Sequence, residues 1–405
     1  MVYAGIAVAT GTRHELDSES GMAHLVEHMT FKGTPRLTSL QILNRMERVG
    51  GDLNAYTGKE ETIYYSIFLR QHLRRAIPLL LDIVFHSTFP QEELDKEVEV
   101  VIDEIESYND SPAELIYDDF ESLLFPGQPL GRKILGDADR LRQYRSADLR
   151  RFTERTYSPE RALLFVKGNV SIEQVCKAIG TAEPAKDAIA SMTSIDSIDS
   201  IDSIASMASI DSIPPSLTGG GGSFILPKPV HQAHVMLGSR AYAYSDPRYF
   251  GLFLLNNLLG GPAMNSRLSL ALRERAGLVY TVESCVTAYT DTGVWSTYFG
   301  CDAADVRRCL RLVERELRRL IDAPLPPRTL AAAKTQLKGQ LGVSYDNFEN
   351  AALGMAKRVL HDGRVTTPAE IFAAIDALTP ALLQDIAADI LDPARLTTLI
   401  YQPEA

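Results

Sequence analysis

The sequence predicts an α+β fold divided into two halves, and two observations lead to this prediction. Strand and helix patterns are mixed without the strict βαβ alternation of a doubly wound sheet. A repetitive tract near the middle of the 405-residue chain separates two halves of similar size, and a chain of this length has room for two domains. The second half loosely repeats the element order of the first, which indicates duplicated domains.

The dividing tract reads SMTSIDSIDSIDSIASMASIDSI over residues 191–213, and two prolines and a run of four glycines follow it. A Ser-Ile-Asp repeat of this kind specifies no unique packing, and it has too few turns to build a solenoid core. We therefore interpret it as a flexible linker. The expected organisation is a domain at 1–180, a linker at 181–222 and a second domain at 223–405.

In the first half, alternating apolar residues predict a strand at 2–10. Thr38 and Gln41 form a capping box that opens a helix ending at Gly50 and Gly51. The other elements expected in this half are a strand pair at 52–57 and 62–69, a helix at 71–86 that contains Pro78, and an acidic helix after Pro90. The second half is expected to hold a strand at 234–243, an apolar helix at 248–261 and a helix that runs into a strand over 268–289.

Composition excludes several functional classes. The formal net charge of −11 argues against a nucleic-acid surface and against attraction to an anionic membrane, because both need clustered Lys and Arg. The four cysteines form no CxxC pair, which argues against a zinc knuckle and fits a reducing compartment. No run of eighteen apolar residues is present, and the N-terminus lacks the pattern of a signal peptide. We expect a cytoplasmic protein without a membrane span.

The stretch GMAHLVEHMTFKGTP at residues 21–35 carries two histidines four residues apart. Ser18 or Ser20 is expected to cap a helix here, and Gly33 with Pro35 is expected to end it. Residues four apart lie one turn apart on the same helix face, so the two imidazoles can bind one ion.

His24 and His28 with Glu27 form the pattern HxxEH, the inverse of HExxH, which occurs among catalytic zinc motifs. Two neutral imidazoles suit Zn²⁺, which in a catalytic site takes a third protein ligand and leaves one position to water. Zinc lowers the pKa of that water toward about 7, and a nearby carboxylate can accept its proton. The alternative is an amphipathic helix with chance histidines, but a chance HxxEH in this chain has an expectation of only about 0.01.

The third ligand is expected to be a carboxylate of the acidic helix. The candidates among its acidic residues are Glu93, Glu97, Glu99, Asp103, Glu104 and Glu106. A charge run of this kind is usually a solvated face, so the run alone does not select one member. Glu97 and Glu104 lie seven residues apart and therefore share a face, which can supply a ligand and a second carboxylate that orients it.

These residues resemble the pitrilysin, insulinase and mitochondrial processing peptidase family of zinc peptidases. The matching segments are GMAHLVEHMTFKGT, GGDLNAYTGKEETIYY, the acidic helix and GGPAMNSRLSLALRERAGLVYTV, which occur in the family's order and cover nearly the whole chain. The resemblance implies that His24, His28 and Glu104 bind Zn²⁺. It also implies that Glu27 is the general base and that Glu97 supports catalysis.

The resemblance extends to substrate binding. GGDLNAYT is similar to the family's edge strand, to which a substrate peptide adds as a further strand, and Asn54 and Ala55 occupy the matching positions. Without the family, the same segment reads as an ordinary hairpin. Arg273 and Tyr280 match an Arg and a Tyr that bind the substrate carbonyl and stabilise its oxyanion. The second half carries no HxxEH, so one zinc site per chain is expected.

The resemblance also implies an architecture and a partner. The chain resembles one half of a peptidase clamshell, made of two similar domains that are each a mostly antiparallel sheet packed with helices. Small family members pair, so we expect a homodimer, with a heterodimer as the alternative, in which Arg273 and Tyr280 act across the interface. Family members usually begin with a further strand or two before the segment matching residues 2–15, so we expect a shortened start or a bare sheet edge.

The function expected from these residues is that of a zinc metalloendopeptidase acting on peptides or unfolded polypeptide segments. Two alternatives stay open, namely a non-catalytic peptide-binding or scaffolding subunit of a heteromeric peptidase and a hydrolase with a non-peptide substrate. Non-catalytic relatives typically lose part of the zinc motif, and all four of its residues are present here, which favours the enzyme.

Overall fold

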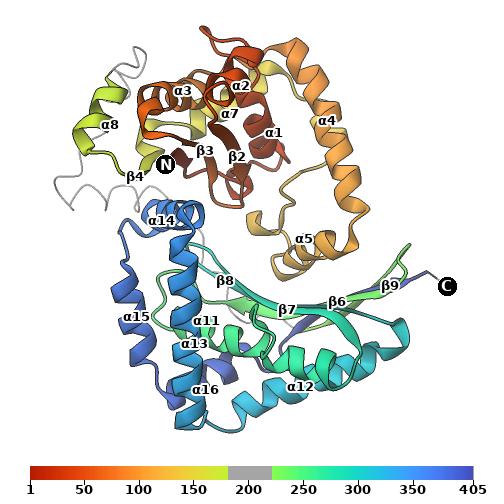
Figure 1. The fold of residues 1–405 in the computed structure, drawn as a ribbon. Helices are drawn as coiled ribbons and strands as arrows, with labels where there is room; N and C mark the ends of the chain where they lie inside the picture. Colours follow the sequence, from red (N-terminus) through yellow and green to blue (C-terminus); the bar gives the residue numbers. More distant parts are fainter. Residues whose placement is uncertain (181–220, 405) are drawn as a thin grey trace. The chain divides into compact units, whose positions relative to one another are not determined.

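The computed structural model describes residues 1–180 and 221–404, and these residues form two compact units (Figure 1). The first unit contains Met1–Ser107, residues 127–180 and Tyr345–Val365, and the second contains Tyr108–Pro126, residues 221–344 and residues 366–404. The predicted linker at 181–222 lies outside the described residues except for its last two positions.

The first unit is built on an antiparallel sheet with the strand order β2-β3-β1-β4. Its strands are β1 (Val2–Val8), β2 (Asp52–Thr57), β3 (Thr62–Phe68) and β4 (Ala162–Gly168). The predictions of a strand at the start of the chain and of a strand pair after residue 51 are confirmed. β1 lies inside the sheet, where Val2 is opposite Phe68 of β3 and Gly168 of β4. β2 forms one edge of the described sheet.

Helices cover one face of this sheet and bury most of the unit's core. They are α1 (Met22–Thr30), α2 (Ser39–Glu47), α3 (Leu73–His86), α4 (Gln91–Asn109), α6 (Ala138–Leu141), α7 (Ser146–Thr156) and α8 (Ile172–Ile179). Ile6 of β1, Leu25 and Met29 of α1, Leu80 of α3 and Phe152 of α7 belong to one buried apolar cluster. Because α1 contributes fully buried residues to this cluster, packing fixes the helix that carries the HxxEH motif.

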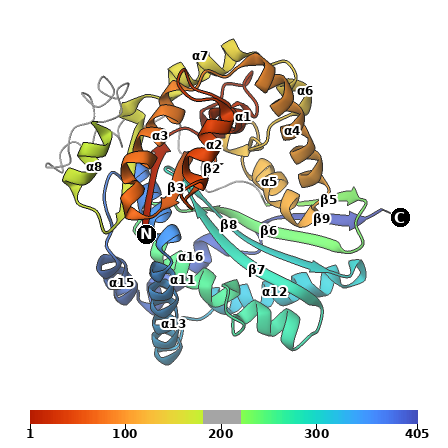
Figure 2. The ribbon, with the colours of Figure 1, turned by 45° about the horizontal axis from the view of Figure 1, so that its top comes forward.

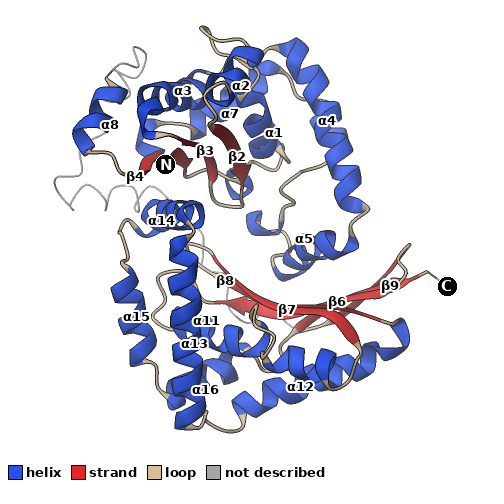
Figure 3. Cartoon of the chain, in the orientation of Figure 1, coloured by secondary structure: helices blue, strands red, loops and turns tan. Residues whose placement is uncertain are grey.

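The second unit is built on a sheet with the order β5-β9-β6-β8-β7, antiparallel except for the parallel pair β5–β9. Its strands are β5 (Ser223–Lys228), β6 (Ala233–Ala241), β7 (Val279–Ala288), β8 (Gly293–Cys301) and β9 (Thr397–Pro403), and its helices are α5 (Pro112–Leu124), α11 (Tyr249–Gly260), α12 (Val306–Ile321), α13 (Pro327–Asp346), α15 (Pro368–Ala377) and α16 (Pro380–Ile390). Figure 3 shows α11, α12 and α16 on one face of this sheet and α5 on the other. The fold is therefore α+β with two sheet-based units, as predicted.

Each unit includes one helix from the other half of the chain. α14 (Phe348–Asp362) packs on the first sheet, where Ala352 and Leu360 join Ile63 and Phe165 in a second buried cluster. α5 packs on the second sheet, where the guanidinium group of Arg240 donates hydrogen bonds of 2.6 and 2.8 Å to the carbonyl of Leu124, and Figures 1 and 2 both place α5 beside β6.

Two expected boundaries differ from the structure. The helix opened by the Thr38–Gln41 capping box ends at Glu47 and not at the glycines, because a turn precedes Gly50, whose φ of 69° suits glycine. The helix expected from residue 268 is a π-helix at Ser269–Glu274. Among the described residues no single helix is both long and apolar enough to cross a membrane, although the bent pair α15 and α16 meets that test together.

Candidate metal centre

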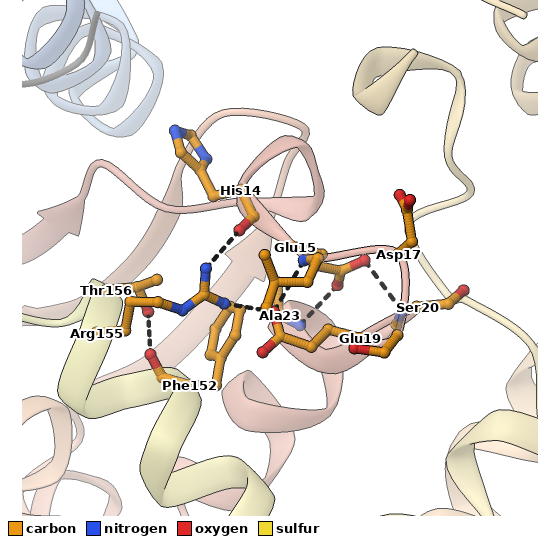
Figure 4. Close-up of polar contacts among 12 residues, drawn as sticks. His14, Glu15, Asp17, Glu19, Ser20, Ala23, Phe152, Arg155 and Thr156 are labelled. Carbon is orange, nitrogen blue, oxygen red and sulfur yellow. Dashed lines mark hydrogen bonds and ion pairs between the residues drawn. The ribbon is translucent and has the colours of Figure 1, made fainter. Parts of the chain in front are cut away.

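The helix that carries the two histidines begins at a glycine and not at a serine. Gly21 occupies the N-cap with a φ of 77°, and no side chain of the cap residue bonds to the first turn. The carboxylate of Glu15 takes over this role, because it accepts the backbone N–H groups of Gly21 at 3.2 Å and Ala23 at 2.9 Å (Figure 4). The prediction that Ser18 or Ser20 caps this helix is therefore wrong.

The loop that supplies Glu15 is fixed by further polar contacts. Arg155 forms an ion pair with Glu19 (Figure 4), and Arg132 forms one with Asp17 at 2.5 Å. Burial raises the pKa of Glu15 to about 8, against the effect of the two backbone hydrogen bonds. The start of α1 is thus held by side chains from a loop upstream of it and from residues more than a hundred positions downstream.

Three side chains of the first unit converge on one point. Glu104 Oε2 lies 3.7 Å from His24 Nε2 and 3.5 Å from His28 Nε2, and one ligand atom from each residue lies within 4.8 Å of the others. Ligands that bind zinc tetrahedrally at about 2.0–2.2 Å lie roughly 3.3 Å apart. Two imidazole nitrogens and one carboxylate are a donor set that zinc accepts, so these residues fit a zinc ion.

The protonation of the two histidines differs because their surroundings differ. Burial, together with the neighbouring His28, lowers the pKa of His24 to about 3, so this imidazole is neutral and able to bind a metal. Among the described residues its buried Nδ1 has no hydrogen-bond partner. Burial is the largest influence on His28 and opposes its charged form, but the hydrogen bond to Glu97 and the charges of Glu27, Glu97 and Glu104 together outweigh it and raise the pKa of His28.

Glu97 lies behind His28 on the side away from Glu104. Its Oε1 is 3.0 Å from His28 Nδ1, and its Oε2 is 2.5 Å from the ammonium group of Lys32. These contacts lower the pKa of Glu97 although burial opposes them. The shared helix face predicted for Glu97 and Glu104 thus brings both carboxylates to the same histidine.

Glu27 is buried beside the same site and is bonded to the edge strand. Its Oε2 accepts a 2.6 Å hydrogen bond from the hydroxyl of Thr57, the last residue of β2. Burial raises the pKa of Glu27, and the Thr57 hydrogen bond opposes that shift. Thr57 was not predicted from the sequence, although it is the last residue of the segment GGDLNAYT.

Asn54 and Ala55 lie in β2, at the edge of the first sheet. Asn54 pairs with Tyr65 of β3 and Ala55 pairs with Tyr64. The amide of Asn54 donates a 2.9 Å hydrogen bond to the carboxylate of Asp52 on the same strand. The strand therefore has the edge position that the addition of a further strand requires.

Arg273 and Tyr280 belong to the second unit, whereas His24, Glu27, His28, Glu97 and Glu104 belong to the first. Arg273 lies in the π-helix, and its Nε donates a 2.8 Å hydrogen bond to Glu274. Tyr280 lies in β7 where the pairing with β8 shifts between Val279 and Val282, and its side chain is 92% exposed. π-helices and β-bulges are both frequent at functional sites.

The fold and the site define an α+β protein with an inverted HxxEH helix beside an edge strand, the motif of a class of zinc enzymes. A family model described as insulinase (peptidase family M16) matches residues 1–138, and one described as the peptidase M16 inactive domain matches residues 145–337. The chain belongs to this insulinase family, peptidase family M16.

Individual relatives agree with this assignment. The uncharacterized zinc protease YmxG of Bacillus subtilis is 31% identical over 93% of this chain and 87% of its own length. The mitochondrial-processing peptidase subunit beta of Bos taurus is 28% identical over 94% of this chain and 76% of its own. The structure of a protease from Helicobacter pylori has the same fold, with a TM-score of 0.86, 20% identity and coverage of 99% of this chain and 94% of that one.

Proposed function

We propose that the protein is a zinc-dependent metalloendopeptidase that hydrolyses peptides or unfolded polypeptide segments. The observation that carries this proposal is the convergence of His24, His28 and Glu104, with the buried carboxylate of Glu27 next to them. Relatives named as zinc proteases over nearly the whole chain support it. The two histidines and Glu104 would hold the ion.

Zinc bound there would supply Lewis acidity, which polarises a peptide carbonyl and lowers the pKa of water toward about 7. Glu27 would accept the proton of the attacking water at its carboxylate and deliver it to the leaving amine. Thr57 bonds one oxygen of this carboxylate, and in the described part of the chain no hydrogen bond or ion pair engages the other, which can take up that proton. Since burial raises the pKa of Glu27, the group is a better base than an exposed glutamate.

The substrate would bind as an additional strand along β2, next to Asn54 and Ala55. The position of β2 at the edge of the first sheet supports this mode, because main-chain groups at a sheet edge can pair with another strand. Most of the affinity would then come from backbone hydrogen bonds, so the enzyme would accept many peptide sequences if their backbone is extended.

Arg273 and Tyr280 would bind the substrate carbonyl and stabilise the oxyanion that develops on it. The exposure of Tyr280 leaves its hydroxyl free for such a contact. We propose that the active form is a homodimer in which these two residues serve the zinc centre of the partner subunit.

Two observations favour a second candidate, a non-catalytic peptide-binding subunit of a heteromeric peptidase. The family model that matches residues 145–337 is described as an inactive domain, and one relative is named as the beta subunit of a mitochondrial-processing peptidase. The complete set of His24, Glu27, His28 and Glu104 argues for the enzyme, since a subunit that only binds peptides has no need of a general base.

The deciding experiment is cleavage of a quenched-fluorescent, unstructured peptide by the wild type and by Glu27→Gln at equal zinc content. We expect the wild type to cut and the variant to bind zinc without cutting. Glu106→Gln, an exposed change on the same helix as Glu104, serves as the control with unchanged activity. If neither wild type nor variant cuts although both hold zinc, the chain is the non-catalytic subunit.

A further inference from the structure

We propose that Lys32 is a positioning residue of the metal centre, acting through Glu97 on His28. The inference rests on the proposed function, because it concerns how the chain prepares His28 to bind the metal. It starts from a row of three side chains in which Lys32 Nζ lies 2.5 Å from Glu97 Oε2 and Glu97 Oε1 lies 3.0 Å from His28 Nδ1.

The two glutamates that reach His28 differ in their counter-ions. Glu97 is held by Lys32, whereas Glu104 has no lysine or arginine within ion-pair distance among the described residues. The side chain of Glu97 is 10% exposed and that of Glu104 is 45% exposed. Lys32 neutralises the charge of Glu97 and leaves the charge of Glu104 available to a cation. The two carboxylates on the same helix face can therefore have different roles, Glu97 in orienting His28 and Glu104 in binding the metal.

A buried carboxylate needs a compensating charge to stay ionised and in place. Removing one partner of a buried ion pair leaves the other uncompensated, and such a side chain turns toward solvent. Lys32 provides that compensation from the segment that follows α1, two residues after the helix ends at Thr30. Its ammonium group fixes the orientation of the Glu97 carboxylate, since each oxygen is engaged by a different partner.

The orientation of Glu97 in turn determines the state of His28. A histidine that binds a metal through Nε2 carries its proton on Nδ1, and a carboxylate that accepts a hydrogen bond from this N–H group fixes the tautomer and the plane of the ring. Loss of such a partner typically costs about 10–100-fold in metal affinity. Lys32 belongs to this arrangement although it is too far along the chain to be part of the HxxEH pattern.

The test compares Lys32→Met and Lys32→Arg with the wild type. Zinc affinity is measured by competition with a chromophoric chelator, and the His28 Nδ1–H proton is followed by NMR of the zinc-loaded protein. We expect Lys32→Met to weaken zinc binding by about 10-fold and to lose the downfield proton signal, because Glu97 no longer faces His28. Lys32→Arg retains the positive charge and should therefore keep both the zinc affinity and the downfield proton signal of the wild type.

Two further variants keep the inference falsifiable. Lys96→Met removes a lysine that pairs with Glu93 on the same helix as Glu97 at 2.8 Å, and it should change neither measurement. In a Glu97→Gln background, Lys32→Met should have no further effect, because a neutral amide needs no counter-ion. The role of Lys32 would be overturned if Lys32→Met left zinc affinity and the proton signal unchanged. It would also be overturned if Lys32→Met weakened zinc binding in the Glu97→Gln background as much as it does in the wild type. Failure of the wild type to bind zinc would instead overturn the proposed function.

Discussion

The hydroxyl of Thr57 and the carboxylate of Glu27 are joined by a 2.6 Å hydrogen bond that is buried inside the first unit. Thr57 ends the edge strand β2, and Glu27 stands between the two histidines of α1. The strand proposed to pair with substrate is therefore bonded directly to the group proposed to move the proton. This contact gives a peptide bound along the strand a fixed relation to the base.

Replacing Thr57 by Val should lower kcat by about 10-fold or more while leaving zinc content unchanged, because a hydrogen bond to a charged group is worth about 1.5–3 kcal/mol. Thr57→Ser keeps the hydroxyl and should retain most of the activity. The measurement is steady-state cleavage of a fluorogenic peptide, with zinc quantified in the same samples. An unaltered kcat in Thr57→Val would show that Glu27 is oriented without this bond.

Replacing Glu104 by Gln should weaken zinc binding by more than about 100-fold, since loss of a ligand costs more than loss of a residue that only orients one. Glu106→Gln lies on the same helix at an exposed position and should bind zinc like the wild type. Both affinities can be obtained by chelator competition. Equal zinc affinities for the two variants would mean that the third ligand is another residue.

Methylation of a substrate's backbone should reduce cleavage far more than replacement of its side chains. If the peptide adds to β2, an N-methyl group at a pairing position removes a donor and places a methyl group between the strands. A series of peptides methylated at one residue at a time should show loss at alternate positions near the cleaved bond, because successive N–H groups of a strand point in opposite directions. A uniform response along the peptide would contradict the addition of a strand.

Mixing two inactive variants should restore activity if the centre is shared between subunits. Glu27→Gln lacks the base and Arg273→Ala lacks an oxyanion donor, but a mixed dimer would contain one intact combination. We expect the separate variants to be nearly inactive and the reassembled mixture to recover about a quarter of wild-type activity, because random pairing gives half mixed dimers and each of these has one intact centre of two. No recovery, in a mixture shown to have exchanged subunits, would place Arg273 in the same subunit as the zinc it serves.

The stability of the first unit should depend on pH through a buried contact between Glu61 and His361. His361 Nε2 lies 2.9 Å from Glu61 Oε2, and Lys357 lies 2.7 Å from the other oxygen. Although burial opposes both charges, His361 and Lys357 lower the pKa of Glu61 from 4.5 to about 2, and Glu61 raises the pKa of His361 above 6.5.

The contribution of Glu61 to the free energy of unfolding is fully present above pH 4.5 and is lost as the pH falls through about 2. The contribution of His361 to the free energy of unfolding is fully present below pH 6.5 and is lost as the pH rises through the raised pKa of His361. The difference in Tm between wild type and His361→Gln should therefore be largest between pH 4.5 and 6.5 and should shrink at higher pH. His231→Gln, an exposed substitution in the second unit, serves as the control in the same measurement.

Much of the first unit was predictable because its signals are local. The Thr38–Gln41 capping box, the strand pair around Gly58 and the HxxEH spacing each depend on residues within a few positions of one another. The start of α1 was predicted wrongly because its cap is supplied by Glu15, six residues before Gly21, and a carboxylate at that distance forms no recognisable capping pattern.

The remaining features depend on contacts between distant parts of the chain. The acidic helix showed which carboxylates share a face, but only packing buries Glu97 against Lys32 and leaves Glu104 half exposed. In the same way, the composition of α5 and α14 gives no indication of which sheet each helix covers. These choices follow from tertiary packing, which a periodic pattern does not encode.

The exchange of α5 and α14 between the two halves has a consequence for biosynthesis. The ribosome releases the strands and helices of the first unit early, but the helix that covers the second face of its sheet ends at Asp362. The apolar side chains of Ala7, Ile63 and Phe165 must therefore remain uncovered, or be shielded by a chaperone, until about nine-tenths of the polypeptide has emerged. Neither half produced alone can complete its own core, so a chain cut in the middle regains its structure only when both fragments are present together.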